Sequence, residues 1–278
     1  MEMGTHAPVF MGIINVTPDS FSDGGQYHAR SAAIRLADDL VDSGAGWLDI
    51  GGESTRPGAM PVDEATELGR VIPAVRTIAA RHRLPISIDT SKSVVAERAI
   101  DAGATIVNDV TGGCADPDVL SVVKGAPARF IIGHWPKHIP ERYRDTRPGA
   151  DCAERVFVEL ERLVTSAVDA GLEPSQLLVD PGIGFGKEMV DNWSILRNLS
   201  RLADRCRLPI VVGVSRKRLL ADRTPDVPNE RDFATSSLHA QLMNAGSVDV
   251  LRAHNIVALR QAALVAQRWS GVVSEEDR

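Results

Sequence analysis

The sequence predicts an α/β fold, a single (β/α)8 barrel of the TIM type, and three observations support this prediction. Short apolar runs rich in β-branched residues recur eight times between segments of helical spacing, and strands buried on both faces have this composition. Polar residues gather where these runs end, which is where the loops of such a barrel form the catalytic face. The length of 278 residues is close to the ~250 typical of one barrel. Because no change of composition marks a second domain, we expect one domain over residues 1–278, with an acidic tail that frays from about residue 270.

The first half of the chain alternates regularly between strand and helix patterns. Apolar runs predict strands at residues 9–16, 47–51, 86–90 and 106–110. Apolar residues at helical spacing predict helices at residues 32–41, 64–82, 93–102 and 116–123. The first two strands are followed by polar connections at 17–26 and 53–58, so we expect both loops at the catalytic face.

The second half repeats the alternation with one long interruption. Apolar runs predict strands at residues 129–134, 177–180, 210–214 and 248–253. Helical spacing predicts helices at residues 152–170, 192–203, 232–244 and 256–269. Gly171 is suited to end the first of these helices as a C-cap. Residues 135–150, rich in Pro and Arg, form the longest irregular segment and are where we expect a mobile or lineage-specific insertion.

Composition and charge exclude several classes of function. Hydrophobic residues make up 44% and charged residues 24%, ordinary values for a soluble globular protein, and the net charge is -6. This balance argues against broad binding to nucleic acid. Cys114, Cys152 and Cys206 are odd in number and lack metal-type spacing, so we expect neither a disulfide framework nor a zinc site. With no signal-peptide pattern at residues 1–8 and no apolar run near the ~20 residues of a membrane span, we expect a cytoplasmic protein without a membrane partner.

Three polar side chains at strand ends suggest a pocket for a flat heterocycle. Asp89, Asn108 and Asp180 end three different strands that open toward one mouth. A carboxylate beside an amide suits a ring edge that alternates N–H donors with a carbonyl, and Lys217 can donate to such a ring. A single Asp at such a place is more often a helix N-cap, and Asp89 before Thr90 fits that alternative. The coincidence of three such residues with Lys217 favours a binding site.

The last strand predicts an anion site on the same face. Arg252 and His254 are two residues apart, so their side chains point to the same side of the strand. Together with Asn15 and residues 215–217 they would form a cationic rim rich in donors, where phosphate sites of these barrels recur. We expect pyrophosphate with magnesium there, since Asn15 offers an oxygen ligand of the kind that Mg²⁺ prefers.

Two stretches near the start of the chain resemble the signature motifs of the dihydropteroate synthases, a family of pterin-binding enzymes. Residues 15–25 read NVTPDSFSDGG, and residues 49–58 read DIGGESTRPG. Further motifs stand in the order of that family: SIDT at 87–90, ND at 108–109, DPGIGFGK at 180–187 and SRK at 215–217. The resemblance covers roughly residues 11–269, and the two opening motifs are highly specific.

The resemblance implies a transferase of folate biosynthesis with two small-molecule substrates and Mg²⁺ as cofactor. It would join 6-hydroxymethyl-7,8-dihydropterin diphosphate to p-aminobenzoate and release pyrophosphate and 7,8-dihydropteroate. The residues implied to hold the pterin are Asp89, Asn108, Asp180 and Lys217, and Gly213 is implied to bind substrate. Those implied to hold pyrophosphate are Asn15, Arg252 and His254, with the magnesium on Asn15. Those implied to close over the second substrate are Thr55, Arg56, Pro57, Phe185 and the loop 19–21. The implied catalytic residues are Asp19, Asp89, Asp180 and Lys217.

The chain departs from the family pattern at a few positions. Gly133 stands where Met is common, which would remove an apolar wall beside the pterin. Asn255 replaces a usual Asp, and Ala234 replaces a frequent Gly. These changes bear on substrate affinity and on the response to sulfonamides more than on the class of reaction.

Two other functions remain open at this point. One is a methyltetrahydrofolate methyltransferase on a related barrel, which would not require the motif at 15–25 or the pyrophosphate rim. The other is an altered paralogue that binds pterin without this catalysis or that uses another arylamine. Homodimers are usual in families of this kind, and the interface candidates in the last two helices are Leu238, Leu242, Val257 and Leu264. Ordinary packing onto the barrel is the competing interpretation of these four residues.

Overall fold

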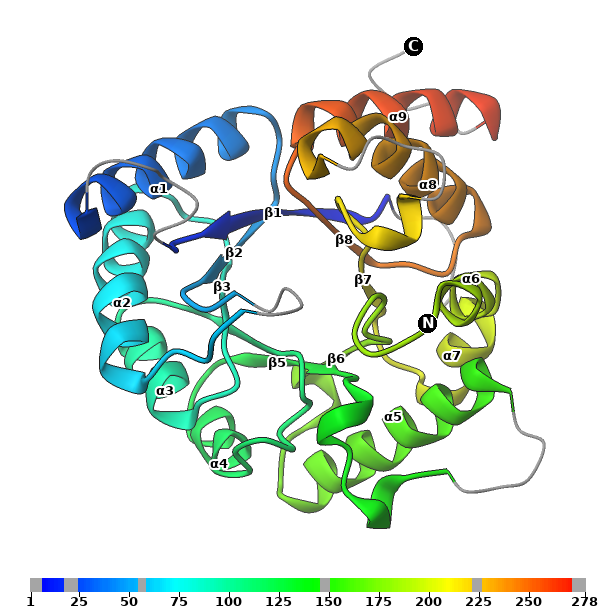
Figure 1. The fold of residues 1–278 in the computed structure, drawn as a ribbon, viewed down its shortest axis with the longest axis horizontal. Coiled ribbons are helices and arrows are strands. Elements are labelled where there is room, and N and C mark those ends of the chain that lie inside the picture. The colour runs from blue at the N-terminus through cyan, green and yellow to red at the C-terminus, as the bar shows by residue number, and fades with distance from the viewer. Residues whose placement is uncertain (1–6, 18–24, 55–58, 146–150, 222–226, 272–278) are drawn as a thin grey trace.

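Eight parallel strands form one sheet that closes into a barrel (Figure 1). The computed structural model describes residues 7–17, 25–54, 59–145, 151–221 and 227–271. The strands are β1 (Val9–Asn15), β2 (Trp47–Gly51), β3 (Ile86–Asp89), β4 (Ile106–Asp109), β5 (Arg129–Gly133), β6 (Leu177–Asp180), β7 (Val211–Gly213) and β8 (Val250–Ala253). Their order is β6-β5-β4-β3-β2-β1-β8-β7, and a bridge between Val179 and Ile210 joins the two ends. The predicted (β/α)8 barrel is therefore confirmed.

The helices surround the strands as an outer ring (Figure 1). In the described part of the chain they are α1 (Gly25–Asp42), α2 (Glu64–Arg81), α3 (Ser93–Asp101), α4 (Asp118–Lys124), α5 (Cys152–Asp169), α6 (Met189–Arg197), α7 (Leu199–Cys206), α8 (Asp232–Ala245) and α9 (Ile256–Trp269). Side chains cap several of them: Asp63, Asp151 and Asn255 each accept a hydrogen bond from a backbone N–H in the first turn of α2, α5 and α9. None of the helices described is both long and apolar enough to cross a membrane.

The predicted helix at 192–203 is wrong as a single element. The structure has two helices, α6 and α7, that meet at Asn198. The Asn198 side chain donates a hydrogen bond to the carbonyl of Ser194 at 2.8 Å, and its backbone leaves the helical region with φ -116° and ψ 17°. Because Asn competes for backbone partners in this way, it interrupts a helix that the apolar spacing alone would continue.

The core has two layers that follow the alternation of side chains along each strand. One apolar cluster contains Met11, Trp47, Ile106, Ile131, Leu178, Val211 and Val250, the strand residues whose neighbours in sequence pack against the helices. By strand parity these side chains fill the barrel interior. Two residues further along their strands, the same parity brings Asp49, Asn108, Asp180 and Arg252 to the interior. The interior is thus apolar at the start of the strands and polar at their carboxyl ends.

Candidate active site

A hydrogen-bonded network of acidic and basic side chains crosses the barrel interior. Arg252 Nε donates to Asp49 Oδ2 at 2.9 Å, and its Nη2 contacts the same oxygen and donates to Asp89 Oδ2 at 3.1 Å. Asn108 Nδ2 also donates to Asp49 Oδ2, at 3.1 Å. The network joins β2, β3, β4 and β8, so it brings three predicted site residues, Asp89, Asn108 and Arg252, together around Asp49.

Asp49 was not predicted as a site residue, although it begins one of the motifs of the sequence. It is almost completely buried, and its Oδ1 has no hydrogen-bond partner among the described residues. A signal for it exists in the sequence, because a carboxylate inside the apolar strand at residues 47–51 requires a buried partner. Sequence alone does not say that this partner is Arg252, which lies 203 positions further along the chain.

Two carboxylates share one guanidinium in this network, and this affects their protonation. The pKa of Asp89 rises to about 7, chiefly because burial disfavours the charged form, and the negative charge of Asp49 raises it further. The positive charge of Arg252 opposes that shift. Burial lowers the pKa of Arg252, but Asp49 and Asp89 raise it by more, so the guanidinium stays charged. Asp89 therefore exchanges its proton near neutral pH.

The alternative role of Asp89 as a helix cap is not observed. Helix α3 begins at Ser93, and its N-cap residue Lys92 makes no side-chain capping bond. The N–H of Ser93 instead donates to Asp116 Oδ2 at 2.7 Å, from the loop before α4. The carboxylate of Asp89 is therefore directed to Arg252 and to the barrel mouth, where 24% of its side chain is exposed.

Asp180 ends β6 and begins a tightly bonded loop. Its Oδ1 accepts a hydrogen bond from the N–H of Gly182 at 2.7 Å. The buried amine of Lys187 holds the rest of this loop, donating to the carbonyls of His134, Gly182 and Phe185 at 3.0, 2.8 and 3.2 Å. Carbonyl oxygens carry no full charge, so burial lowers the pKa of Lys187 to about 7, against the raising effect of Asp180.

Lys217 follows β7 and lies beside this loop. Its Nζ donates to the carbonyl of Ile183 at 2.5 Å and lies 4.5 Å from the centre of the Phe185 ring. Burial lowers the pKa of Lys217 to about 8; the charge of Asp180 opposes this shift and that of Arg252 adds to it. The structure thus places Lys217 beside Phe185 and near the charge of Asp180.

The rim was predicted to be cationic, but in the structure its two arginines are paired with carboxylates. Arg252 is paired with Asp49 and Asp89, and Arg216 Nε donates to Asp232 Oδ1 at 2.7 Å. Both guanidinium charges are therefore balanced by carboxylates. Arg252 keeps one group for a ligand, because its Nη1 makes no hydrogen bond with the residues that the structure describes.

Gly213, at the end of β7, makes room for that guanidinium. A Cβ added to Gly213 would lie 3.2 Å from Arg252 Nη1, closer than most real contacts of this kind. Nearby, His254 Nδ1 lies 2.9 Å from Ser215 Oγ, which also accepts from the His254 backbone N–H at 3.2 Å. The ring of His254 is therefore held in place at the end of β8.

The remaining predicted residues belong to the first two loops. Asn15 is the last residue of β1 and is partly exposed at the mouth. Its side chain makes no hydrogen bond within the described ranges. Asp19, Thr55 and Arg56 lie outside the described residues.

Two of the departures from the family pattern have a structural explanation. A Cβ on Gly133 would lie 2.5 Å from Val110 Cα and 2.6 Å from Asp109 O, so backbone fills the space that a side chain would need. Asn255 serves as the N-cap of α9, with its Oδ1 accepting from the N–H of Ala258 at 2.9 Å. Its Nδ2 donates to Asp232 at 3.1 Å, which an aspartate there could not do. Nothing in the structure explains Ala234.

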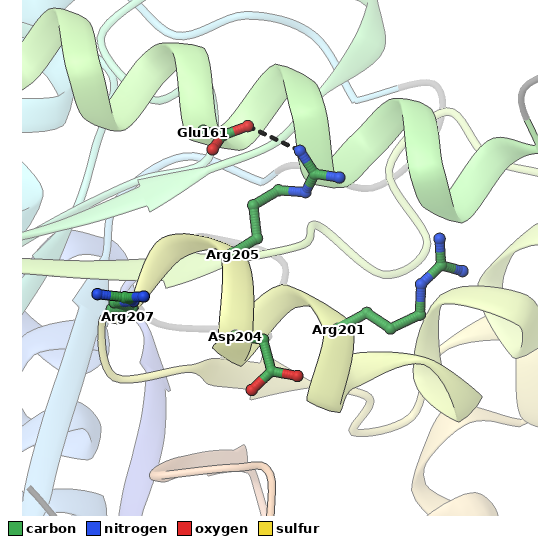
Figure 2. Close-up of a pocket in the computed structure, with 5 residues that line it drawn as sticks. All are labelled: Glu161, Arg201, Asp204, Arg205 and Arg207. Atoms are coloured by element: carbon green, nitrogen blue, oxygen red, sulfur yellow. Dashed lines mark hydrogen bonds and ion pairs between the residues drawn. The ribbon is translucent and has the colours of Figure 1, made fainter.

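A separate hollow of about 530 Å³ lies outside the barrel, between α5 and α7 (Figure 2). Its walls are Glu161, Arg201, Asp204, Arg205 and Arg207. Arg205 bridges Glu161 and Glu154, and Arg201 pairs with Glu154 as well. These charges largely neutralise one another, and no strand ends there. We assign the active site to the barrel mouth instead.

Comparison with known proteins shows which family the chain belongs to. The family described as pterin binding enzyme matches residues 11–254. The dihydropteroate synthase of Mycobacterium leprae (strain TN) is 39% identical over 270 residues, which cover 95% of this chain and 94% of that protein. The dihydropteroate synthase of Xanthomonas albilineans, solved with 4-aminobenzoic acid, has a TM-score of 0.86 at 37% identity and covers 96% of this chain and 94% of its own. The dihydropteroate synthase of Clostridium difficile, solved in the presence of pteroic acid, has a TM-score of 0.87 at 37% identity. The match covers 97% of this chain and 98% of that one.

The barrel, its polar mouth and the family match define a pterin-binding enzyme, and the chain belongs to that family. Its relatives in sequence and in structure match over nearly its whole length and are dihydropteroate synthases. The chain is accordingly placed among the dihydropteroate synthases, and the resemblance seen in the motifs is confirmed. The alternative of a methyltetrahydrofolate methyltransferase receives no support from these matches.

Proposed function

We propose that this chain condenses 6-hydroxymethyl-7,8-dihydropterin diphosphate with p-aminobenzoate, giving 7,8-dihydropteroate and pyrophosphate in folate biosynthesis. The observation that supports this most is the gathering of Asp89, Asn108, Asp180 and Lys217 at one mouth of a barrel of this family. Carboxylate, amide and amine groups there match the edge of a pterin, which offers both donors and acceptors.

The charges at the mouth suit a reaction through a cation. Departure of pyrophosphate leaves a pterin-methyl cation delocalised into the ring, so charge stabilisation helps more than a strong base. The carboxylates of Asp89 and Asp180 would stabilise the electron-poor pterin. The carbon–oxygen bond to pyrophosphate breaks first, the arylamine nitrogen then attacks the methylene carbon of the cation, and the ammonium product loses its proton to water.

The leaving group would bind near the ends of β1 and β8. Arg252 Nη1 and the ring of His254 can donate to phosphate oxygens. Asn15 offers an amide oxygen to Mg²⁺, an ion that usually takes few protein ligands and fills its other positions with water and phosphate oxygens. When bound, the ion would neutralise charge on the leaving pyrophosphate.

A direct assay tests the proposed reaction. Purified protein with pterin diphosphate should release pyrophosphate only when p-aminobenzoate is added, and 7,8-dihydropteroate should appear in equal amount. Release without the arylamine, or none under any condition, would favour the altered paralogue. Dependence on a different arylamine would correct the acceptor and leave the pterin half of the proposal intact. The p-aminobenzoate analogues of the sulfonamide class should compete with the acceptor in the same assay.

We also propose that the chain acts in the cytoplasm as a homodimer. Of the four interface candidates, Leu242 is buried within its own chain and Leu238 packs against its core. Val257 and Leu264 are 53% and 55% exposed on α9, and they remain candidates for burial against a second copy. Sedimentation of the wild type and of a variant with Val257→Asp and Leu264→Asp decides this: a monomeric wild type contradicts the proposal.

A further inference from the structure

Trp135 lies next to the ring that covers Lys217. It is the second residue after β5, and its ring centre lies 5.3 Å from that of Phe185 at an angle of 45°. The centre of the same ring lies 4.9 Å from that of His138, at an angle of 66°. Phe185 in turn lies 4.5 Å from Lys217 Nζ. These three contacts connect His138, Trp135 and Phe185 to Lys217 in one continuous series.

The backbone that carries Phe185 is fixed between the same two side chains. A Cβ added to Gly184 would lie 3.1 Å from Lys217 Cδ, so the chain before Phe185 contacts Lys217. A Cβ added to Gly186 would lie 3.6 Å from two atoms of the Trp135 indole, so the chain after Phe185 contacts Trp135. Phe185 is partly exposed, and its ring contacts Trp135 and Lys217.

We propose that Trp135 is a positioning residue that fixes Phe185 and thereby sets the width of the site for the arylamine acceptor. This inference rests on the proposed function, in which Phe185 borders the second substrate. Tilted aromatic pairs are favourable beyond their area of contact, so loss of the indole releases the phenyl ring to other rotamers. Position 133 cannot supply an apolar side chain because backbone occupies that space. Trp135 is thus the aromatic surface that the segment after β5 offers to this site.

The test separates binding of the acceptor from the rest of the reaction. Trp135→Ala should raise the KM for p-aminobenzoate about three- to tenfold, the range that corresponds to loss of one aromatic pair. The KM for pterin diphosphate and kcat should change less than about twofold. Trp135→Phe retains a ring and should restore most of the affinity. Trp269→Ala, which removes a Trp that is 86% exposed on α9, is the matched control and should leave all constants unchanged.

A second substrate distinguishes positioning from general damage to the fold. The ratio of kcat/KM for 4-amino-3-methylbenzoate to that for p-aminobenzoate should rise in Trp135→Ala, because the site becomes wider. Destabilised protein would lower both values equally and leave the ratio unchanged. If Trp135→Ala does not fold, Trp135→Phe and His138→Ala decide, with smaller shifts of the ratio in the same direction expected. An unchanged ratio in all folded variants overturns the inference.

The KM for p-aminobenzoate in Phe185→Ala shows whether a negative result contradicts the role of Trp135 or the proposed acceptor site itself. If Phe185→Ala raises the KM for p-aminobenzoate and the double variant is no worse, Trp135 acts through Phe185 and the inference holds. If Phe185→Ala raises that KM while Trp135→Ala does not, the positioning role is wrong and the acceptor site remains. If Phe185→Ala has no effect on it, the acceptor site itself is misplaced.

Discussion

Two sides of the barrel mouth bury charged groups in different ways. On the side of β2, β3 and β8, the carboxylates of Asp49 and Asp89 contact the guanidinium of Arg252 directly. On the side of β6 and β7, the amines of Lys187 and Lys217 donate mainly to backbone carbonyls. The first side is held by side-chain ion pairs, and the second by loop backbone and an aromatic ring.

The pKa shifts run in opposite directions because burial disfavours the charged form of an acid and of an amine alike. On the first side, burial raises the pKa of Asp89 to about 7, and the negative charge of Asp49 adds to this shift. Carbonyl dipoles on the second side satisfy the lysines without neutralising them, and the pKa values of Lys187 and Lys217 fall to about 7 and about 8. Both sides therefore change their proton content near neutral pH. A pterin lying between them would meet an acidic group on one side and an amine on the other.

The largest effect should come from removing a group that is proposed to touch the pterin. Asp180→Asn or Lys217→Ala should abolish measurable turnover, a fall in kcat/KM of at least about a hundredfold, because hydrogen bonds to charged groups are lost. Steady-state assays measure this, and circular dichroism should show folded protein. Wild-type kcat/KM in either variant would contradict the assignment.

A smaller effect is expected when the side of β2, β3 and β8 loses the buried carboxylate of Asp49. Asp49→Asn should lower kcat/KM about ten- to a hundredfold, since a buried ion pair is broken. It should also move the acidic limb of the kcat/KM profile to lower pH, because the charge of Asp49 raises the pKa of Asp89. Asp116→Asn, which removes only the carboxylate that binds the start of α3, is the control. An unshifted limb in Asp49→Asn would show that Asp89 does not determine it.

The leaving-group site predicts a moderate effect on binding. Arg252→Ala should weaken pyrophosphate binding about tenfold or more, through loss of a charged donor. Calorimetric titration with and without Mg²⁺ measures this, and Asn15→Ala should reduce the gain that magnesium gives. Equal pyrophosphate affinity in both conditions, together with no loss in Arg252→Ala, would place the anion elsewhere.

The smallest effect is on stability, and it has opposite signs on the two sides. Between about pH 4 and 7 the folded protein holds a proton on Asp89 that the unfolded chain has lost, so this group's contribution to the free energy of unfolding falls as pH rises. Between about pH 7 and 10 the unfolded chain holds a proton on Lys187 that the folded protein lacks, so that contribution rises with pH. Urea unfolding of Asp89→Asn and Lys187→Met against wild type isolates each slope. Parallel curves would refute both shifts.

The sequence predicted the strands well because a strand buried on both faces leaves a plain apolar run. It also placed Asp89, Asn108 and Asp180 at strand ends, and in the structure all three lie at the mouth. It did not predict the partners within that mouth. The pairing of Asp49 with Arg252 depends on β1 lying between β2 and β8 in the sheet, which no local pattern records.

Two other features escaped prediction for physical reasons. The break at Asn198 depends on one side-chain hydrogen bond that outweighs an apolar spacing typical of a continuous helix. The role of Trp135 depends on how an irregular segment folds back against the loop at 180–187, and such segments have no periodic pattern. By contrast, Asn255 was noted as a departure in sequence, and its position as an N-cap explains why the exchange is tolerated.

The closure between β6 and β7 has a consequence for hydrogen exchange. The two strands are joined by a single bridge, with the N–H of Val179 donating to the carbonyl of Pro209 at 3.0 Å, whereas the other neighbouring strands share longer ladders. The amide proton of Val179 should therefore exchange with solvent sooner than those of the central strands. Asp180 and Lys217 stand on either side of this seam, so a pterin bound to both would tie its edges together and slow that exchange.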